Sequence, residues 1–517
     1  MRVLAVAESS SGSSMAKAKP TRTSKEENAA ATPASRVAAK GKKRKPERKA
    51  KQVHGRRRKR ANIADRAVLE PNAAGIDIGA REMYVAVPAD RDEDPVRVFD
   101  TFTADLNQLA DWLVACGVTT VAMESTGVYW IPLFEILEAR GIRPCVVNAR
   151  HMKNVPGRRT DWHECQWIQF LHSVGLLRAA FRPEADVCAL RTVIRHHGEL
   201  VQMAGKHVQH MHKALTQMNL QIQHVITDMT GCTGLAIIDA ILNGERDPVE
   251  LTKLRDPRIK ASREIIEKSL VGHWQPEHLF TLKQSRRLYA EYQHQLAECD
   301  AEIERLTGSF PPLVDPEVKP LPPDSKKNRN YAKNRKKRAK MQQPNQNFDL
   351  RTEVYKLFGV DVTQIPGLEF LALQLFSEIG RDMSRWPTAA HFVSWLALCP
   401  DNDISGGRVL WRGARKAHNR AGQLFRMAAY SLDRSATPLG DYLRRMKAKL
   451  GPKAAHTATA HKTAVIFYTM VRNQVEYDQT IWEKRDEQRR QRHTARLKRQ
   501  AERLGYQLIA IQEENAA

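Results

Sequence analysis

The chain has 517 residues, 42% of them hydrophobic, and a formal net charge of +25. The hydrophobic share excludes a wholly disordered chain, the length predicts roughly two to four domains, and the excess of cations indicates a polyanionic partner such as nucleic acid. The seven cysteines form no Cys-x-x-Cys pair and no apolar run approaches the ~18 residues of a membrane span, so we expect no zinc ribbon, no disulfide framework, no membrane partner and a reducing cytoplasm.

Residues 1–66 are predicted to be a disordered basic tail. Residues 1–60 hold 19 Lys and Arg against 4 Glu, so they supply +15 of the net charge and leave the rest of the chain only mildly basic. A segment this charged lacks the apolar surface that a core requires. Two interpretations stay open: an electrostatic arm for nucleic acid, or a solubilising tail with no specific role.

Residues 67–180 alternate between strand and helix patterns. Short apolar runs predict strands, and segments with apolar residues every three or four positions predict helices. Strands that alternate with helices indicate a layered α/β domain. The expected strands are 73–78, 83–87, 118–123 and 143–147, and the expected helices are 106–116, 130–139 and 162–177.

The rest of the chain is predicted to be mainly helical, so the expected fold class is α/β plus mainly α. Residues 181–310 lack strand patterns and predict a helical coiled-coil spacer, with long helices over 190–220 and 282–306. Residues 311–348 are rich in proline and cations and predict a flexible basic linker. A mostly helical domain is expected over 349–475, followed by a charged helical tail over 476–517.

Four carboxylates lie where the predicted strands and helices of residues 67–180 begin or end. Asp77 and Glu124 are at the ends of two strands, and Asp161 and Glu164 open a helix, where positions i and i+3 share one face. Hard divalent cations bind oxygen ligands, and like charges repel unless a cation lies between them. The residues by themselves leave two interpretations open: a cation site for phosphodiester cleavage, or ordinary solvated and capping acids, with Asp161 as a helix N-cap.

A Ser-Gly-Gly segment at Ser405 is followed by a run of cations. Glycines let a backbone approach a phosphate closely, but a serine hydroxyl needs activation before it can attack. From the residues alone, the segment is either the site of a nucleophile or an ordinary turn. The side chains expected either to contact a nucleic-acid backbone or to remain solvated at the surface are Arg408, Arg412, Arg415, Lys416, Asn419 and Arg420.

An Ile-Pro-Gly-Leu segment at 365–368 precedes a short apolar run over 371–379. This pattern is typical of half of a helix-hairpin-helix, which presents backbone amides to phosphates. It is equally typical of a glycine-containing turn between core helices, and the sequence does not decide between the two.

These segments resemble one group of bacterial insertion-sequence transposases, the group conventionally numbered 110, which is related to the pilin-gene inversion recombinases. The resemblance rests on the Met-Glu-Ser-Thr-Gly-Val-Tyr-Trp run at 123–130 and the Ser-Gly-Gly segment, and it covers nearly all of residues 73–475 outside the linker. It implies a RuvC-like domain of the ribonuclease-H fold over 67–180 and a C-terminal serine transposase domain over 349–475.

The resemblance also implies roles for individual residues. Asp77, Glu124, Asp161 and Glu164 are expected to bind Mg²⁺ or Mn²⁺, and Ser405 is expected to be a nucleophile that forms a covalent bond with a DNA phosphate. The group usually has Asp where this chain has Glu164, and the longer side chain changes the metal geometry to be expected there.

The function implied is DNA recombination that mobilises an insertion sequence in the bacterial cytoplasm, at the nucleoid. The expected partners are the element ends and target DNA, a structured non-coding bridge RNA, and further copies of the chain in a dimer or tetramer. Two alternatives stay open. A structure-selective junction nuclease would use the same carboxylates with water as the nucleophile. A domesticated, non-catalytic nucleic-acid-binding protein would not use them for catalysis at all.

Overall fold

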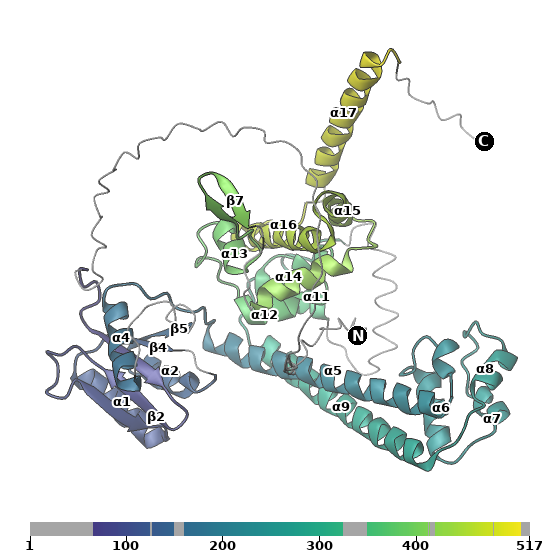
Figure 1. Cartoon of the computed structure of the whole chain (residues 1–517), viewed down its shortest axis with the longest axis horizontal. Coiled ribbons are helices and arrows are strands. Elements are labelled where there is room, and N and C mark those ends of the chain that lie inside the picture. The colour runs from purple at the N-terminus through teal and green to yellow at the C-terminus, as the bar shows by residue number, and fades with distance from the viewer. Residues whose placement is uncertain are drawn as a thin grey trace, which may run out of the picture. The chain divides into compact units, whose positions relative to one another are not determined.

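The computed structural model describes residues 66–124, 127–148, 160–323, 349–411, 413, 419–478 and 480–507. The chain divides after Phe181 into two compact units, named unit 1 (up to Phe181) and unit 2 (from Arg182) (Figure 1). Nearly all of the predicted basic tail and most of the predicted linker lie outside the described residues.

Unit 1 contains a five-stranded mixed sheet with the strand order β3-β2-β1-β4-β5. Strand β1 pairs antiparallel with β2 and parallel with β4, while β2 pairs antiparallel with β3 and β4 parallel with β5. The strands are β1 (Ala73–Ile78), β2 (Glu82–Ala86), β3 (Val96–Asp100), β4 (Thr120–Glu124) and β5 (Arg143–Val147).

Helices cover both faces of this sheet. Alternate residues of a strand point to opposite faces, and one set packs with helices α1 (Thr103–Ala115) and α2 (Trp130–Ala139) in the main core of the unit. The other set lies against helix α4 (Asp161–Ser173), where Ala122 and Ile168 share a small cluster. The layered α/β arrangement expected from the sequence is therefore confirmed.

The strands and helices predicted for unit 1 are all present, within a few residues of the expected bounds. Strand β3 was not predicted. Its sequence, Val-Arg-Val-Phe-Asp, is short and follows an acidic loop, it lies at one edge of the sheet, and most of its residues are exposed. An edge strand has only one neighbour and carries a weak apolar signal.

Unit 2 begins with two long antiparallel helices, α5 (Ala185–Gln217) and α9 (Pro276–Gly308), which lie side by side (Figure 1). The pair is held partly by polar contacts, including a 3.2 Å ion pair between His197 and Asp300. Between these helices the chain forms a small helical head, which the sequence did not predict. The head contains η2 (Ile222–His224), α6 (Cys232–Leu242), α7 (Pro248–Lys253) and α8 (Arg263–Ser269), packed on their own apolar core.

The C-terminal part of unit 2 is mostly helical, in agreement with the expected fold class. Fully buried phenylalanines pack edge-to-face or stacked at its centre: Phe358, Phe376, Phe392, Phe425 and Phe467. The helices are α11 (Leu350–Phe358), η3 (Val362–Gln364), α12 (Ala372–Ile379), α13 (Ala389–Trp395), α14 (Arg420–Ser431), α15 (Pro438–Leu450), α16 (Pro452–Asn473) and the charged helix α17 (Thr480–Arg503). A two-stranded hairpin, β6 (Asp403–Ser405) and β7 (Arg408–Trp411), interrupts them.

The turn at Ile365-Pro366-Gly367 packs inside this helical domain. Ile365 and Leu368 are fully buried, and Gly367 adopts a positive φ of 90° close to α14, where an added Cβ would lie 2.7 Å from the carbonyl oxygen of Ala428. These contacts favour a structural turn between core helices over a phosphate-binding hairpin. None of the described helices is both long and apolar enough to cross a bilayer.

Candidate active site

The register of the sheet places Asp77 and Glu124 on neighbouring strands and on the same face. Ile76 of β1 pairs with Met123 of β4 in parallel, so Asp77 and Glu124 are the next residues along their strands. Ile76 and Met123 point into the core shared with α1 and α2. Because neighbours along a strand alternate, Asp77 and Glu124 point to the other face, toward α4.

Helix α4 brings Glu164 to this pair because it approaches β1 very closely. A Cβ added to Gly75 would lie 2.2 Å from the backbone nitrogen of Gln169 and 2.4 Å from the carbonyl oxygen of Cys165, so only glycine allows this contact. The amide of Gln169 also donates a 3.1 Å hydrogen bond to the carbonyl oxygen of Ala73. Gly75 and Gln169 are positioning residues that the sequence analysis missed, although a glycine two residues before Asp77 was a signal for close backbone approach.

The start of α4 is fixed by Thr160, whose hydroxyl accepts a hydrogen bond from the backbone N–H of His163. Thr160 is therefore the N-cap, and Asp161 is the first residue inside the helix. The alternative interpretation of Asp161 as the N-cap is wrong.

Carboxylate oxygens of Asp77, Glu124 and Glu164 all lie within 4.8 Å of one another. Oxygen ligands of one Mg²⁺ ion lie about 2.1 Å from it and hence about 3–4 Å apart, so small side-chain rotations suffice to close the group around a cation. Glu124 is buried and the other two are half-buried, which removes much of the water that would otherwise screen three like charges. The donor set and its spacing therefore fit a hard divalent cation.

Asp161 is not part of this three-carboxylate group, although all four acids were predicted to act together. It is exposed, and it lies near enough for its charge to act on Tyr84 and Cys165, both of which are also affected by Asp77. Glu164, where the chain departs from the Asp usual in the resembled group, is the helix residue that joins Asp77 and Glu124.

Two ionisable neighbours of the carboxylates remain protonated near neutral pH. Burial, together with the charges of Asp77 and Asp161, raises the pKa of the Cys165 thiol to about 12, and the thiol donates to the carbonyl oxygen of Trp162 at 3.1 Å. A hydrogen bond to Glu82, followed by burial and nearby negative charge, raises the pKa of Tyr84. Neither side chain offers an anionic ligand, so the candidate metal-binding group in this part of unit 1 consists of the carboxylates of Asp77, Glu124 and Glu164.

Ser405 lies in unit 2, as the last residue of β6, and it pairs across the hairpin with Arg408. The two residues between them, Gly406 and Gly407, have φ angles of 55° and 77°. Positive φ at both central positions is typical of a tight type I′ hairpin turn, which residues with side chains rarely adopt. Paired residues of a hairpin point to the same face, so the Ser405 hydroxyl and the Arg408 guanidinium share one face next to a tip without side chains.

The other predicted nucleic-acid contacts differ in what their side chains do. Arg408 and Arg420 are exposed. Asn419 caps α14 by accepting from the N–H of Gly422 at 2.9 Å and donates to the carbonyl oxygen of Trp395 at 3.0 Å, so both ends of its amide are used within the fold. Three further predictions, Arg412, Arg415 and Lys416, fall outside the described residues.

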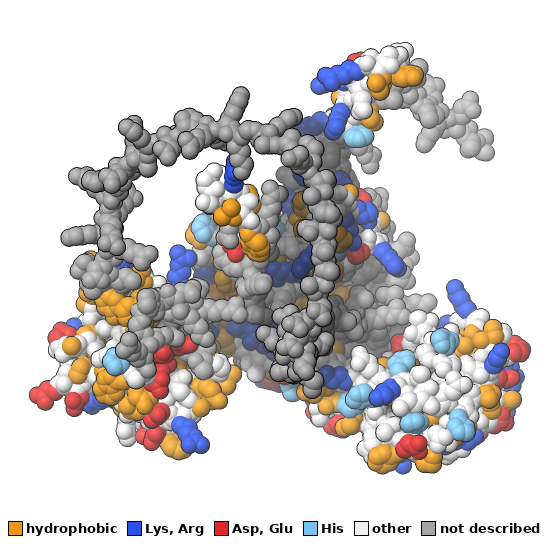
Figure 2. Space-filling model, viewed as in Figure 1, with side chains coloured by type: hydrophobic (Ala, Val, Ile, Leu, Met, Phe, Trp, Pro, Cys, Tyr) orange, Lys and Arg blue, Asp and Glu red, His pale blue; other side chains and the backbone are white. Residues whose placement is uncertain are grey.

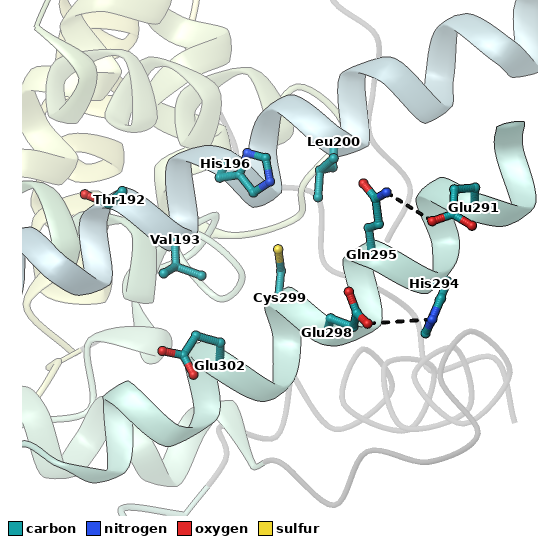
Figure 3. Close-up of a pocket in the computed structure, with 10 residues that line it drawn as sticks. All are labelled: Thr192, Val193, His196, Leu200, Glu291, His294, Gln295, Glu298, Cys299 and Glu302. Atoms are coloured by element: carbon teal, nitrogen blue, oxygen red, sulfur yellow. Dashed lines mark hydrogen bonds and ion pairs between the residues drawn. The ribbon is translucent and has the colours of Figure 1, made fainter.

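A cavity of about 540 Å³ lies between α5 and α9 and involves none of the predicted site residues (Figure 3). Its rim carries Glu291, Glu298 and Glu302 from α9, and His294 pairs with Glu298 at 3.6 Å. Negative charge around an opening disfavours phosphate groups. This cavity is therefore a poor candidate for binding or cleaving a phosphodiester.

Two models of known protein families match parts of the chain. A family model described as "Transposase" matches residues 74–220, and a second model, described as "Transposase IS116/IS110/IS902 family", matches residues 361–443. This chain belongs to the IS110-type transposases. No curated protein matches it.

The two matched regions contain the two candidate sites. The first region of this transposase includes Asp77, Glu124 and Glu164, and the second includes Ser405 and Arg408. Membership of the family makes the protein an enzyme that cleaves and rejoins DNA in transposition, and DNA is its substrate.

Proposed function

We propose that this transposase mobilises an insertion sequence by cutting and rejoining DNA through a covalent bond between Ser405 and a DNA phosphate. The position of Ser405 carries the proposal: it lies beside Arg408 at the tip of an exposed hairpin, next to two glycines that leave room for a phosphate. A plain structural turn has no need of a serine and an arginine on one face.

In the proposed step, the Oγ of Ser405 forms a bond to phosphorus while the bond from phosphorus to the departing sugar oxygen breaks. The serine hydroxyl gives up a proton and the departing oxygen gains one, so one phosphate ester replaces another and no oxidant or nucleotide cofactor is required. Arg408 would hold a phosphate oxygen through charge-assisted hydrogen bonds. Attack by the hydroxyl of a second DNA end on the phosphoserine would rejoin the strands and release Ser405.

The carboxylates are proposed to bind Mg²⁺ or Mn²⁺. Asp77, Glu124 and Glu164 would hold the cation, and Asp161, at the start of the same helix as Glu164, would complete the set of four. Such an ion stabilises the charge that develops on the phosphate and on the departing oxygen.

We also propose that residues 67–180 adopt the RuvC-like ribonuclease-H fold, which the strand order β3-β2-β1-β4-β5 with an antiparallel β2 supports. The coiled-coil spacer over 181–310 and the serine transposase domain over 349–475 belong to the same proposal. The family resemblance suggests three further parts of this proposal. A structured non-coding bridge RNA is the guide, a dimer or tetramer is the active assembly, and the bacterial cytoplasm is the site of action.

The experiment incubates the purified full chain with element-end DNA, the RNA transcribed beside the element, and Mg²⁺. Denaturing gels then separate free DNA from any covalent protein–DNA adduct. We expect an adduct with the wild type, no adduct with Ser405→Ala, and an adduct reduced at least about a hundredfold with Asp77→Asn, because a metal ligand is lost. Arg434→Ala, which removes an exposed cation outside both the hairpin and the predicted nucleic-acid contacts, is the matched control and should lose far less.

Metal-dependent cleavage that survives Ser405→Ala, without an adduct, would contradict the serine mechanism and support a junction nuclease. Binding of DNA without any cleavage, by the wild type as well as the variants, would instead support a domesticated binding protein.

A further inference from the structure

The serine hairpin exposes apolar side chains on the face opposite Ser405. Ile404 pairs with Val409, so the side chains of these two residues point to the face opposite that of Ser405 and Arg408. A bulge between Asp403 and Ile404 makes Leu410 the extra residue of the hairpin, and Leu410 is not part of this face because it directly follows Val409 along the strand. Ile404 is 63% exposed and Val409 is 38% exposed, and hydrophobic side chains reach the surface in this region (Figure 2).

An isolated hairpin with this composition requires a binding partner. Two strands alone are marginally stable in water, and apolar groups gathered on a small exposed element mark an interaction surface. Every described residue of β7 is exposed, so the rest of unit 2 does not bury this strand.

The net charge of the hairpin and the residues that follow it indicates the kind of partner that this apolar face binds. Residues 403–420 contain five Lys and Arg against a single acid, Asp403. A neutral apolar partner or a membrane core would match the apolar groups but not this excess of positive charge, whereas DNA has apolar base faces enclosed between phosphate backbones. A two-stranded ribbon is also of a width that a DNA groove admits.

We propose that the hairpin enters the DNA tip-first at the cleavage position and separates the bases there. Ser405 and Arg408 then face the backbone of the strand to be cut, while Ile404 and Val409 contact the unstacked bases. The Gly406-Gly407 tip carries no side chains and is the thinnest part of the ribbon, which suits it to enter first. This inference takes the position of the phosphate from the proposed function. It adds that the hairpin acts as a wedge, which opens the DNA next to that phosphate.

The test uses element-end DNA with 2-aminopurine beside the cleaved phosphate, because this base fluoresces more strongly when it is unstacked. The variant is Ile404→Thr with Val409→Thr; threonine is a strand former, so the hairpin is preserved. Val475→Thr is the matched control, since Val475 is another exposed aliphatic residue of unit 2, 45% exposed, outside the hairpin. Adduct formation is measured in parallel on fully paired DNA and on DNA with mismatches around the same phosphate.

With paired DNA, we expect a fluorescence rise with the wild type, Ser405→Ala and Val475→Thr, and little rise with the double threonine variant. That variant should form the adduct at least about tenfold more slowly on paired DNA, and at nearly the wild-type rate on mismatched DNA, where the bases are already open. Recovery on mismatched DNA also demonstrates that the variant is folded.

A normal fluorescence rise with the double variant would overturn the wedge. So would a defect that mismatches fail to relieve, because the apolar face would then contact protein, for example a second copy of the chain. If the wild type forms no serine adduct but still unstacks the bases through Ile404 and Val409, the serine mechanism fails and the wedge stands.

Discussion

Substitution of Gly75 by alanine tests whether the contact between β1 and α4 builds the carboxylate group. The added Cβ would lie 2.2 Å from the backbone nitrogen of Gln169, against the 3.4 Å or more of ordinary contact. The obstructing atoms are backbone atoms in the middle of a helix, so no side-chain rotation relieves the clash. The helix must recede by about 1.2 Å, and Glu164 moves with it.

Two effects should follow from this displacement. Overpacking of this kind costs about 1–3 kcal/mol of folding free energy. A shift of Glu164 by about 1 Å relative to Asp77 and Glu124 also disturbs a cation that requires near-ideal geometry, and we expect Mn²⁺ to bind about 10- to 100-fold more weakly, as when groups that orient metal ligands are removed.

The measurements are Mn²⁺ titration calorimetry and thermal unfolding of the full chain. The matched control is Gly198→Ala in α5, where an added Cβ meets nothing within 4 Å; alanine there should leave Mn²⁺ binding unchanged and stabilise the helix by up to about 1 kcal/mol. If Gly75→Ala binds Mn²⁺ as tightly as the wild type and melts at the same temperature, the close approach of α4 does not position Glu164.

Three further predictions concern single side chains. Glu164→Gln should weaken Mn²⁺ binding, measured by the same titration, far more than Asp161→Asn, because only Glu164 joins Asp77 and Glu124; equal losses would contradict this. Asp361→Ala should destabilise the C-terminal helical domain by about 3–5 kcal/mol in urea unfolding, because Asp361 is fully buried and its loss removes the carboxylate that the guanidinium of Arg351 contacts at 2.5 Å. Burial lowers the pKa of His172, whose Nε2 lies 2.9 Å from the Thr120 hydroxyl, so the unfolded chain binds a proton more readily than the folded one. Stability should therefore fall as the pH drops below about 6.5, and His172→Gln should flatten that dependence in unfolding measured between pH 7.5 and 5.5; an unchanged dependence would mean that His172 is not responsible.

The sequence was sufficient to predict every strand and helix of unit 1 named above except β3, together with the acids at their ends. Strand and helix periodicities depend on residues that are neighbours along the chain, and Asp77 and Glu124 lie at the ends of strands whose apolar runs are clear. The alternation along each strand also predicts which face those acids occupy. The Ser-Gly-Gly turn is likewise local, because two glycines with positive φ are determined by their own backbone freedom.

Only the tertiary structure decided which acids meet. Glu164 and Asp161 are both at the start of α4 and look equivalent in the sequence, but the approach of the helix to Gly75 places Glu164 near the sheet and leaves Asp161 exposed. The helical head between α5 and α9 and the exposed apolar face at Ile404 were missed for the same reason. Whether an apolar residue is buried or exposed depends on contacts with residues far away in the chain, and these contacts leave no periodic signal in the sequence.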